Sequence, residues 1–195
     1  MRGAEATLTR KGSLLVKTRL EKNYRVKELD VKIRKLRTRS EFKIIKHLNA
    51  HGVKCPHVFN INETNFEFEL EQLPGNLLRV ALSNASSKDA AKLCEKAGRE
   101  IAKTHNAGVV HGDSTTSNLL VSPEGEVYVI DFGLSEMTNS NEERALDLQL
   151  FKKTVSLVLF EAFLKGYVSE MNEAAKPVLE RLENIEKRGR YKKRN

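Results

Sequence analysis

Residues 109–135, VVHGDSTTSNLLVSPEGEVYVIDFGLS, carry three polar side chains at fixed intervals within a largely apolar stretch. Asp113 and Asn118 are five positions apart, and Asp131 opens an Asp-Phe-Gly triplet directly after an apolar run. Residues 118–132 contain two apolar runs joined by a Pro-Glu-Gly turn, which predicts a β-hairpin. A rigid hairpin would hold Asp131 beside the loop that carries Asp113 and Asn118. We therefore expect these three side chains to form one site.

The spacing of apolar residues predicts the other elements of the chain. These are strands over 13–20 and 65–73, and helices over 30–48, 87–106, 142–164 and 169–188. Asp30 is the expected N-cap of the first helix, and Gly166 is expected to end the third. Strands come first and helices dominate afterwards, which indicates an α+β arrangement of two lobes. We expect an N-lobe over 1–73, a C-lobe over 74–186 and a basic tail over 187–195.

Positive charge gathers at the two ends of the chain. Between Arg10 and Lys46 the sequence has fourteen basic and four acidic residues, and between Glu186 and Asn195 it has six and one. The whole chain has a net charge of only +8, so its middle is acidic. Two basic ends are typical of a protein that meets a polyanion. For the first block, a merely solvated lysine-rich helix face remains an alternative.

Simple features disfavour several classes of protein. No apolar run approaches the roughly 18 residues of a membrane span, so we expect no membrane contact. No secretory signal is visible, and we expect a cytoplasmic protein that in a eukaryote is also nuclear. Cys55 and Cys94 are far apart and lack the paired spacing of a zinc site.

The order of the polar residues resembles the HxDxxxxN and DFG signatures of protein kinases. The resemblance implies that Asp113 orients an attacking hydroxyl, while Asn118 and Asp131 hold Mg²⁺ against the phosphates of ATP. Phosphoryl transfer spreads negative charge over oxygens, so a site that supplies a metal and position suits it. Each triplet alone could be a turn in an unrelated fold, but both in this order argue against that. In kinases the equivalents of His111 and Asp147 are structural, and we expect the same here.

A protein kinase also pairs a lysine on an N-lobe strand with a glutamate on the following helix. Lys17 lies in the first predicted strand and Glu41 in the first predicted helix. Lysines are frequent in this block, and only their order in the chain selects Lys17. Leu15 shares the strand face of Lys17 and is expected to help cover adenine. Glu71 and Leu73, at the end of the second predicted strand, would offer backbone groups to adenine.

Taken as a whole, the chain resembles the small atypical kinase of the KEOPS complex, the PRPK family, a distant relative of the RIO kinases. The resemblance lies in the segments LVKTRLEKNYR, LDVKIRKLRTRSE, HGDSTTSNLLV, VIDFGLS and RGRYKKR, which are spread over nearly the whole chain. A further segment, Gly3, Ala4, Glu5 and Ala6, stands where other kinases have a glycine-rich loop. The resemblance implies a reduced bilobal protein-kinase-like fold, with a small β-rich N-lobe containing one helix and a mainly helical C-lobe.

The resemblance also implies a function. The family includes serine/threonine kinases with ATPase activity that act beside a threonylcarbamoyl-transferase subunit and other KEOPS subunits in forming threonylcarbamoyladenosine on tRNA. The expected cofactors are ATP and Mg²⁺. Basic residues of the N-lobe and of the tail would contact the tRNA backbone. The tail residues are Lys187, Arg188, Arg190, Lys192, Lys193 and Arg194.

Two other functions remain open at this point. A small-molecule phosphotransferase of the aminoglycoside or choline kinase type also carries HGDxxxxN, but only 62 residues follow the second triplet (195 − 133), which leaves little room for its substrate pocket. A scaffold would bind nucleotide weakly and use the basic ends to hold tRNA and a partner protein. The segment between the triplet and Glu142 has no Ala-Pro-Glu sequence, which disfavours a general peptide kinase.

Overall fold

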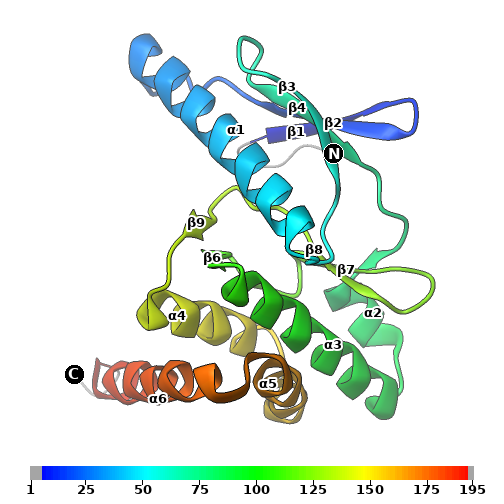
Figure 1. Ribbon diagram of the computed structural model, residues 1–195, viewed down its shortest axis with the longest axis vertical. Coiled ribbons are helices and arrows are strands. Elements are labelled where there is room, and N and C mark those ends of the chain that lie inside the picture. The colour runs from blue at the N-terminus through cyan, green and yellow to red at the C-terminus, as the bar shows by residue number, and fades with distance from the viewer. Residues whose placement is uncertain (1–5, 193–195) are drawn as a thin grey trace.

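The structure is a computed structural model that describes the backbone of residues 6–192 and the side chains of residues 6–188. Its first part is a four-stranded antiparallel sheet with one long helix beside it (Figure 1). The strand order is β1-β2-β4-β3, formed by β1 (Ala6–Lys11), β2 (Leu14–Arg19), β3 (Val58–Asn62) and β4 (Glu67–Glu71). Gly12 makes the tight turn between β1 and β2 at a φ of +64°, a conformation that glycine adopts without strain. Strand β1 was not among the predicted strands.

Helix α1 (Lys27–Ala50) begins earlier than the sequence predicted. Asp30 was the expected N-cap, and this prediction is wrong, because Asp30 is buried within the helix and its carboxylate binds Arg34 at 2.6 Å. An acid in the first turn still stabilises the positive end of the helix. Phe66, which falls within the strand predicted over 65–73, lies just before β4 at a φ of +56°, and the Arg34 guanidinium stacks over its ring, 4.0 Å from the centroid.

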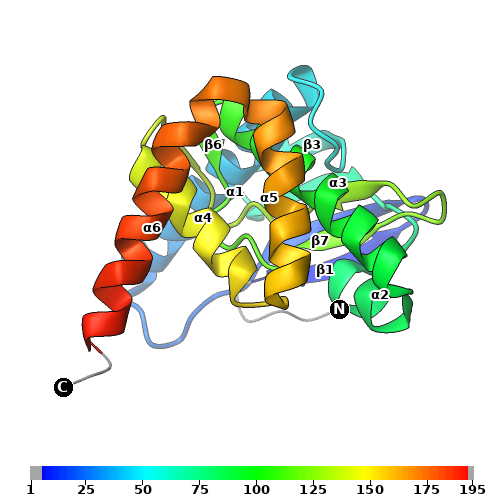
Figure 2. The same ribbon diagram turned by 90° about the horizontal axis from the view of Figure 1, so that it is seen from below.

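The second part of the chain contains two small sheets and several helices. Strands β5 (Asn76–Leu77), β7 (Leu119–Val121) and β8 (Val127–Val129) form one sheet, and β6 (Val109–Val110) pairs with β9 (Glu136–Met137). Strands β7 and β8 are the predicted hairpin. The helices are α2 (Leu78–Asn84), α3 (Ser87–Asn106), α4 (Asn141–Lys152), α5 (Leu157–Met171) and α6 (Ala175–Lys192), with a 3₁₀ turn at Asn172–Ala174. Helix α5 packs across α3 and α6 packs against α4 (Figure 2).

The predicted helix over 142–164 is two helices. Ser156 caps the second one, because its hydroxyl accepts a hydrogen bond from the backbone N–H of Leu159 at 3.4 Å. Gly166 does not end this helix but lies inside α5, where a Cβ atom would come within 1.9 Å of the carbonyl oxygen of Glu95. Gly98 of α3 is equally close to Phe163. The two glycines therefore let α3 and α5 approach more closely than side chains would permit.

Helix α6 starts later and ends later than predicted. Pro177 lies in its first turn, where the missing backbone N–H costs nothing. The helix continues to Lys192, so the first residues of the expected basic tail prolong it. None of the described helices is both long enough and apolar enough to cross a membrane.

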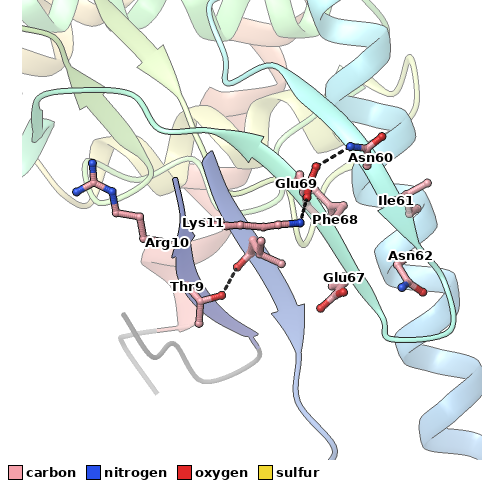
Figure 3. A pocket seen from close by; sticks show the side chains of 10 residues that line it. Thr9, Arg10, Lys11, Asn60, Ile61, Asn62, Glu67, Phe68 and Glu69 are labelled. Atoms are coloured by element: carbon pink, nitrogen blue, oxygen red, sulfur yellow. Dashed lines mark hydrogen bonds and ion pairs between the residues drawn. The ribbon is translucent and has the colours of Figure 1, made fainter. Parts of the chain in front are cut away.

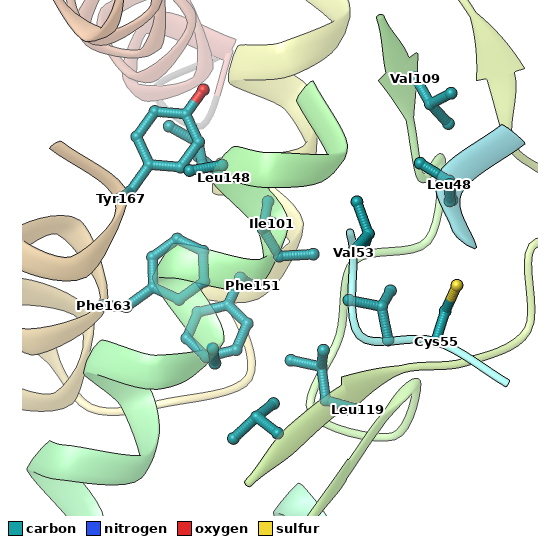
Figure 4. Close-up of a cluster of buried hydrophobic side chains, with 14 of the residues drawn as sticks. Leu48, Val53, Cys55, Ile101, Val109, Leu119, Leu148, Phe151, Phe163 and Tyr167 are labelled. Carbon is teal, nitrogen blue, oxygen red and sulfur yellow. The ribbon is translucent and has the colours of Figure 1, made fainter. Parts of the chain in front are cut away.

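One hydrophobic core joins the two parts of the chain (Figure 4). Phe151 and Phe163 stack with their ring centroids 4.0 Å apart, and Val53 and Cys55, from the segment after α1, belong to the same cluster. The backbone N–H of Val129 donates to the carbonyl of Lys54 at 2.8 Å. The C-terminal end of α1 is thereby held against the helical part, and this fixes the position of the α1 residues that face the candidate site. The small antiparallel sheet with one helix and the mainly helical second part confirm the predicted α+β fold.

Candidate active site

The loop after β6 carries the HGD sequence, and its histidine is fully engaged with the backbone. The His111 ring is buried, its Nε2 donates to the carbonyl of Ile130 at 3.0 Å, and its Nδ1 accepts from the N–H of Asp113 at 3.2 Å. Both ring nitrogens are therefore used for holding the loop. This arrangement agrees with the structural role expected for His111.

Asp113 and Asn118 lie at the two ends of this loop and bind each other. The Asn118 amide nitrogen donates to the Asp113 carbonyl at 2.9 Å and to the Asp113 carboxylate at 2.7 Å. The Asn118 backbone carbonyl also accepts from the N–H of Ile130 at 3.0 Å. Since Ile130 immediately precedes Asp131, the hairpin places Asp113, Asn118 and Asp131 in one neighbourhood, as the sequence predicted.

Asp131 has an unusual backbone and an accessible carboxylate. Its φ of +62° lies in the left-handed region, which is costly for a residue with a side chain and is common at functional sites. Its side chain is 56% exposed, and its carboxylate lies 2.7 Å from the Lys17 ammonium. Partial burial alone would raise the pKa of Asp131, but the charge and hydrogen bond of Lys17 lower it, and the net direction is down. Asp131 is therefore a carboxylate at neutral pH.

Lys17 and Glu41 form the ion pair that the sequence predicted. The Lys17 ammonium on β2 lies 2.5 Å from Glu41 Oε1 on α1, and both side chains are buried. Burial alone would lower the pKa of Lys17, but the charges of Glu41 and Asp131 raise it, so the net shift is upward. Lys17 is thus a permanent cation between two carboxylates.

Sequence reasoning missed a second cation at this position. Arg19 Nη2 lies 2.5 Å from Glu41 Oε2, and its side chain is as buried as that of Glu41. One carboxylate therefore holds two cations. A signal was present in the sequence, because residues two apart on a strand point to the same face, and Arg19 follows Lys17 by two.

Asp147 has a structural role at the HGD loop, as expected. Its buried carboxylate accepts from the N–H groups of His111 at 2.6 Å and Gly112 at 2.9 Å. The same carboxylate accepts from His105 Nε2 at 3.0 Å, and His105 Nδ1 accepts from the Tyr167 hydroxyl at 2.8 Å. Sequence reasoning missed His105 and Tyr167, because nothing in local spacing indicates that α3 and α5 meet there.

The residues expected near adenine and in place of the glycine-rich loop belong to the N-lobe sheet and its flanks. Leu15 is half-buried on the same face of β2 as Lys17. The N–H of Glu71 donates to the carbonyl of His57 at 2.8 Å, and the contribution of a Glu71 backbone group to adenine binding stays a prediction. Leu73 lies in the connection after β4. The segment in place of a glycine-rich loop is described only at Ala6, which begins β1. Gly3, Ala4 and Glu5 lie outside the described residues.

The basic residues expected to contact tRNA are described only in part. Lys187 and Arg188 are exposed on α6, and Lys187 Nζ lies 3.8 Å from Glu183. Arg190 and Lys192 lie on the same helix, with side chains outside the described set. Lys193 and Arg194 are beyond the described part of the chain.

Two hollows lie apart from the Lys17–Asp131 pair. A hollow of about 550 Å³ lies on the N-lobe sheet, where Lys11 and Asn60 both bind Glu69 at 2.7 and 2.6 Å (Figure 3). Val16 also lines it, and because neighbouring strand residues point to opposite faces, it opens away from Lys17. A smaller hollow of about 290 Å³ borders the HGD loop at Gly112.

The side chains at the site suit magnesium better than a metal held by protein alone. Within residues 6–188, the described side chains include no cluster of three or more histidine, cysteine, aspartate or glutamate residues that could hold a metal. Mg²⁺ commonly uses one or two protein oxygens together with phosphates and water. The Asp131 carboxylate is accessible, and the Asn118 amide nitrogen is occupied by Asp113, which leaves its side-chain oxygen as a possible ligand. These two residues fit such a site.

Comparisons with known proteins place the chain in a family. The RIO domain family profile matches residues 11–175. The KEOPS complex subunit Bud32 of Pyrococcus abyssi is 38% identical over 190 residues, covering 93% of this chain and 86% of that protein. A probable serine/threonine-protein kinase BUD32 homolog of Archaeoglobus fulgidus is 35% identical over 98% of this chain and 95% of its own.

A longer relative contains a similar segment. The probable bifunctional tRNA threonylcarbamoyladenosine biosynthesis protein of Methanocorpusculum labreanum is 38% identical over 97% of this chain, which spans only 35% of that relative. Among solved structures, WbdD in complex with the kinase inhibitor LY294002 superimposes with a TM-score of 0.58 at 18% identity, over 85% of this chain and 44% of that one. This likeness concerns the fold alone. On the profile and the full-length relatives, the chain belongs to the RIO domain family and, within it, to the Bud32 group.

Proposed function

We propose that this chain is an ATP-dependent serine/threonine kinase and ATPase that acts as a KEOPS subunit and supports threonylcarbamoyladenosine modification of tRNA. The observation that carries the proposal is the chain of contacts from Asp113 through Asn118 and Ile130 to Asp131 and Lys17. Membership of the Bud32 group, whose relatives include a KEOPS subunit and a probable kinase, supports the choice of reaction and complex.

Each side chain has a distinct task in this proposal. Lys17 binds the phosphates of ATP with its ammonium group, and Asp113 orients the attacking hydroxyl or water through its carboxylate. Asn118 fixes the Asp113 carboxylate through its amide nitrogen, and its oxygen, with Asp131, would hold Mg²⁺. When bound, Mg²⁺ would neutralise the charge that develops on the phosphate oxygens.

ATP hydrolysis tests this function when it is measured in four mixtures. These are the chain alone, the chain with the threonylcarbamoyl-transferase subunit of the same organism, the chain with tRNA, and all three together. We expect magnesium-dependent turnover that rises when the partner and tRNA are present. If no mixture hydrolyses ATP, the proposed enzymatic function is contradicted, and a nucleotide-binding scaffold is favoured.

The tRNA contact is a separate part of the proposal. Exposed Lys187 and Arg188, and the further basic residues that follow them, suit a phosphate backbone. Removal of residues 187–195 should weaken tRNA binding and reduce the slope of affinity against salt concentration. A matched control replaces Lys88 and Lys92, exposed lysines on α3, by alanine. Equal affinity and equal slope for the truncated and full-length chains would exclude the tail as a tRNA contact.

A further inference from the structure

The Asp-Phe-Gly segment, residues 130–135, contacts one residue of the HGD loop at both of its ends. Before the triplet, the carbonyl of Ile130 accepts a hydrogen bond from His111 Nε2 at 3.0 Å. After it, the Ser135 hydroxyl donates to the backbone carbonyl of His111 at 2.9 Å. A turn closes the segment between these points, because the N–H of Ser135 donates to the carbonyl of Phe132 at 3.1 Å. Asp131 therefore lies on a short loop whose two ends are fastened to the same buried residue.

Asp131 has a backbone conformation that its surroundings must maintain. Its φ of +62° lies in the left-handed region, where a residue with a side chain stays only if neighbouring contacts hold it. In this conformation the carboxylate accepts a hydrogen bond from the N–H of Gly133 and lies 2.7 Å from the Lys17 ammonium. A loop with one free end could relax by turning at Asp131, and the carboxylate would then leave this position.

The chain around Ser135 follows the HGD loop closely. A Cβ atom added to Gly112 would come within 2.4 Å of the carbonyl oxygen of Leu134, so no larger residue permits this approach. Immediately after Ser135, β9 pairs with β6 (Figure 1), but the pairing covers two residues of each strand, and those of β9 are exposed. So short a ladder is weak by itself. A side-chain hydrogen bond at its start therefore contributes to holding the segment in register.

We infer that Ser135 is a positioning residue, which fastens the Asp-Phe-Gly segment to the HGD loop and thereby keeps the Asp131 carboxylate where it can bind Mg²⁺. Ser135 acts through the backbone of His111 and not on the nucleotide itself. Ser135→Ala would leave the carbonyl of the buried His111 without this donor and would release the second end of the loop. The inference rests on the proposed function for the metal, whereas the fastening belongs to the chain without nucleotide.

Amide hydrogen exchange of the nucleotide-free chain tests the fastening. The N–H groups at positions 133 and 135 are the probes, because they bind the Asp131 carboxylate and the Phe132 carbonyl within the segment. In Ser135→Ala both should exchange about tenfold faster, since the loop opens more often when one end is free. Ser135→Thr keeps a hydroxyl, and its exchange rates should stay within about threefold of the wild type.

A hydroxyl elsewhere in the fold supplies the matched control. Ser169 of α5 also donates to a backbone carbonyl, that of Gly166, at 2.8 Å. Ser169→Ala should leave the exchange rates at positions 133 and 135 unchanged. Unchanged rates in Ser135→Ala as well would show that the hydroxyl does not fasten the segment, and they would overturn the inference.

Binding of a non-hydrolysable ATP analogue tests the positioning of Asp131. Calorimetry measures the affinity once with Mg²⁺ and once with EDTA. Ser135→Ala should weaken binding at least about fivefold with Mg²⁺ and less than about twofold with EDTA, because Asp131 meets the nucleotide through the metal. In an Asp131→Ala background, Ser135→Ala should cause no further loss with Mg²⁺, because its effect passes through the missing carboxylate.

The outcomes separate this inference from the proposed function. Equal weakening with and without Mg²⁺, or the same loss in the Asp131→Ala background as in the wild type, would make Ser135 merely structural and would overturn its positioning role. If the wild-type chain binds the analogue no better with Mg²⁺ than with EDTA and turns over no ATP in any mixture, the proposed function fails, and the metal clause of the inference fails with it. The exchange rates still decide whether Ser135 fastens the segment.

Discussion

Two polar networks support the candidate site, and they are built differently. The cleft network, formed by Lys17, Arg19, Glu41 and Asp131, consists of full charges and reaches solvent at Asp131. The loop network, formed by His105, Asp147 and Tyr167, is buried throughout and ends on backbone N–H groups of the HGD loop.

This difference in construction implies different roles for the two networks, one in binding ligands and the other in holding the HGD loop. At the exposed end of the cleft network, Asp131 could exchange Lys17 for a metal, and Lys17 could exchange Asp131 for a phosphate. The loop network binds fixed backbone groups and has no solvent-exposed member. It can therefore hold the loop in one geometry, but it cannot respond to a ligand. We expect changes in the cleft network to affect turnover and changes in the loop network to affect stability.

The largest effect is expected at the exposed end of the cleft network. Asp131→Ala should lower magnesium-dependent ATP turnover at least about a thousandfold, which corresponds to about 4 kcal/mol in the barrier. The free energy of unfolding should stay close to that of the wild type, because Lys17 keeps Glu41 as a partner. Glu136→Ala, at an exposed position on β9, is the control. Unchanged turnover would remove the metal assignment, and a large loss of stability would break the comparison between the networks.

The next effect is expected in the loop network. Asp147→Ala should lower the free energy of unfolding by about 3 kcal/mol, because it leaves His105 and buried backbone N–H groups without an acceptor. Urea denaturation measures this change. Glu143→Ala, at an exposed position on the same helix, should cost only a few tenths of a kcal/mol. A loss below 1 kcal/mol for Asp147→Ala would show that the network does not support the loop.

A smaller effect should appear as a pH dependence of stability. Burial lowers the pKa of His105 below its usual 6.5, although Asp147 opposes the shift. The native state then keeps His105 neutral, while the unfolded chain binds a proton below about pH 6.5. This contribution to stability is present above pH 6.5 and is lost as the pH falls, by up to about 1.4 kcal/mol per unit. Unfolding of His105→Asn should show a weaker slope between pH 7.5 and 5.5. Ser87→Ala, at an exposed position on the same helix that carries no titratable group, should keep the slope of the wild type.

The smallest effect is expected from the outer member of the loop network. Tyr167→Phe removes the hydroxyl that donates to His105 Nδ1 and should lower stability by about 1 kcal/mol. Turnover at a temperature well below the unfolding midpoint should be unchanged, because Asp147 still holds the loop. A loss of turnover larger than the loss of stability explains would place Tyr167 with the cleft network instead.

Local patterns were sufficient for part of this structure. The helix over 87–106 and the hairpin after Asn118 follow from periodicity and turn residues, and their bounds agree with the structure. The pairing of Lys17 with Glu41 followed from the order of motifs in the chain. The lobe boundary near Pro74 and the chemical tasks of the site residues remain predictions.

Other features failed because they depend on contacts between distant segments. The third predicted helix is broken before Ser156, and Gly166 serves a close approach of α5 to α3 that no local pattern reveals. Asp30 looked like a cap, yet it is buried where Arg34 binds it. In each case the residue type fitted two local roles, and packing selected one of them.

The sequence by itself determined which chemical groups this protein has and the order in which they occur, because short-range spacing places Asp113, Asn118 and Asp131 on a loop and a hairpin. Only the tertiary structure decided that Arg19 shares Glu41 with Lys17, that His105 binds Asp147, which is 42 residues away, and that Tyr167 binds His105, which is 62 residues away. Such contacts depend on how helices and strands pack, and the periodicity of one segment carries no information about the segment that packs against it.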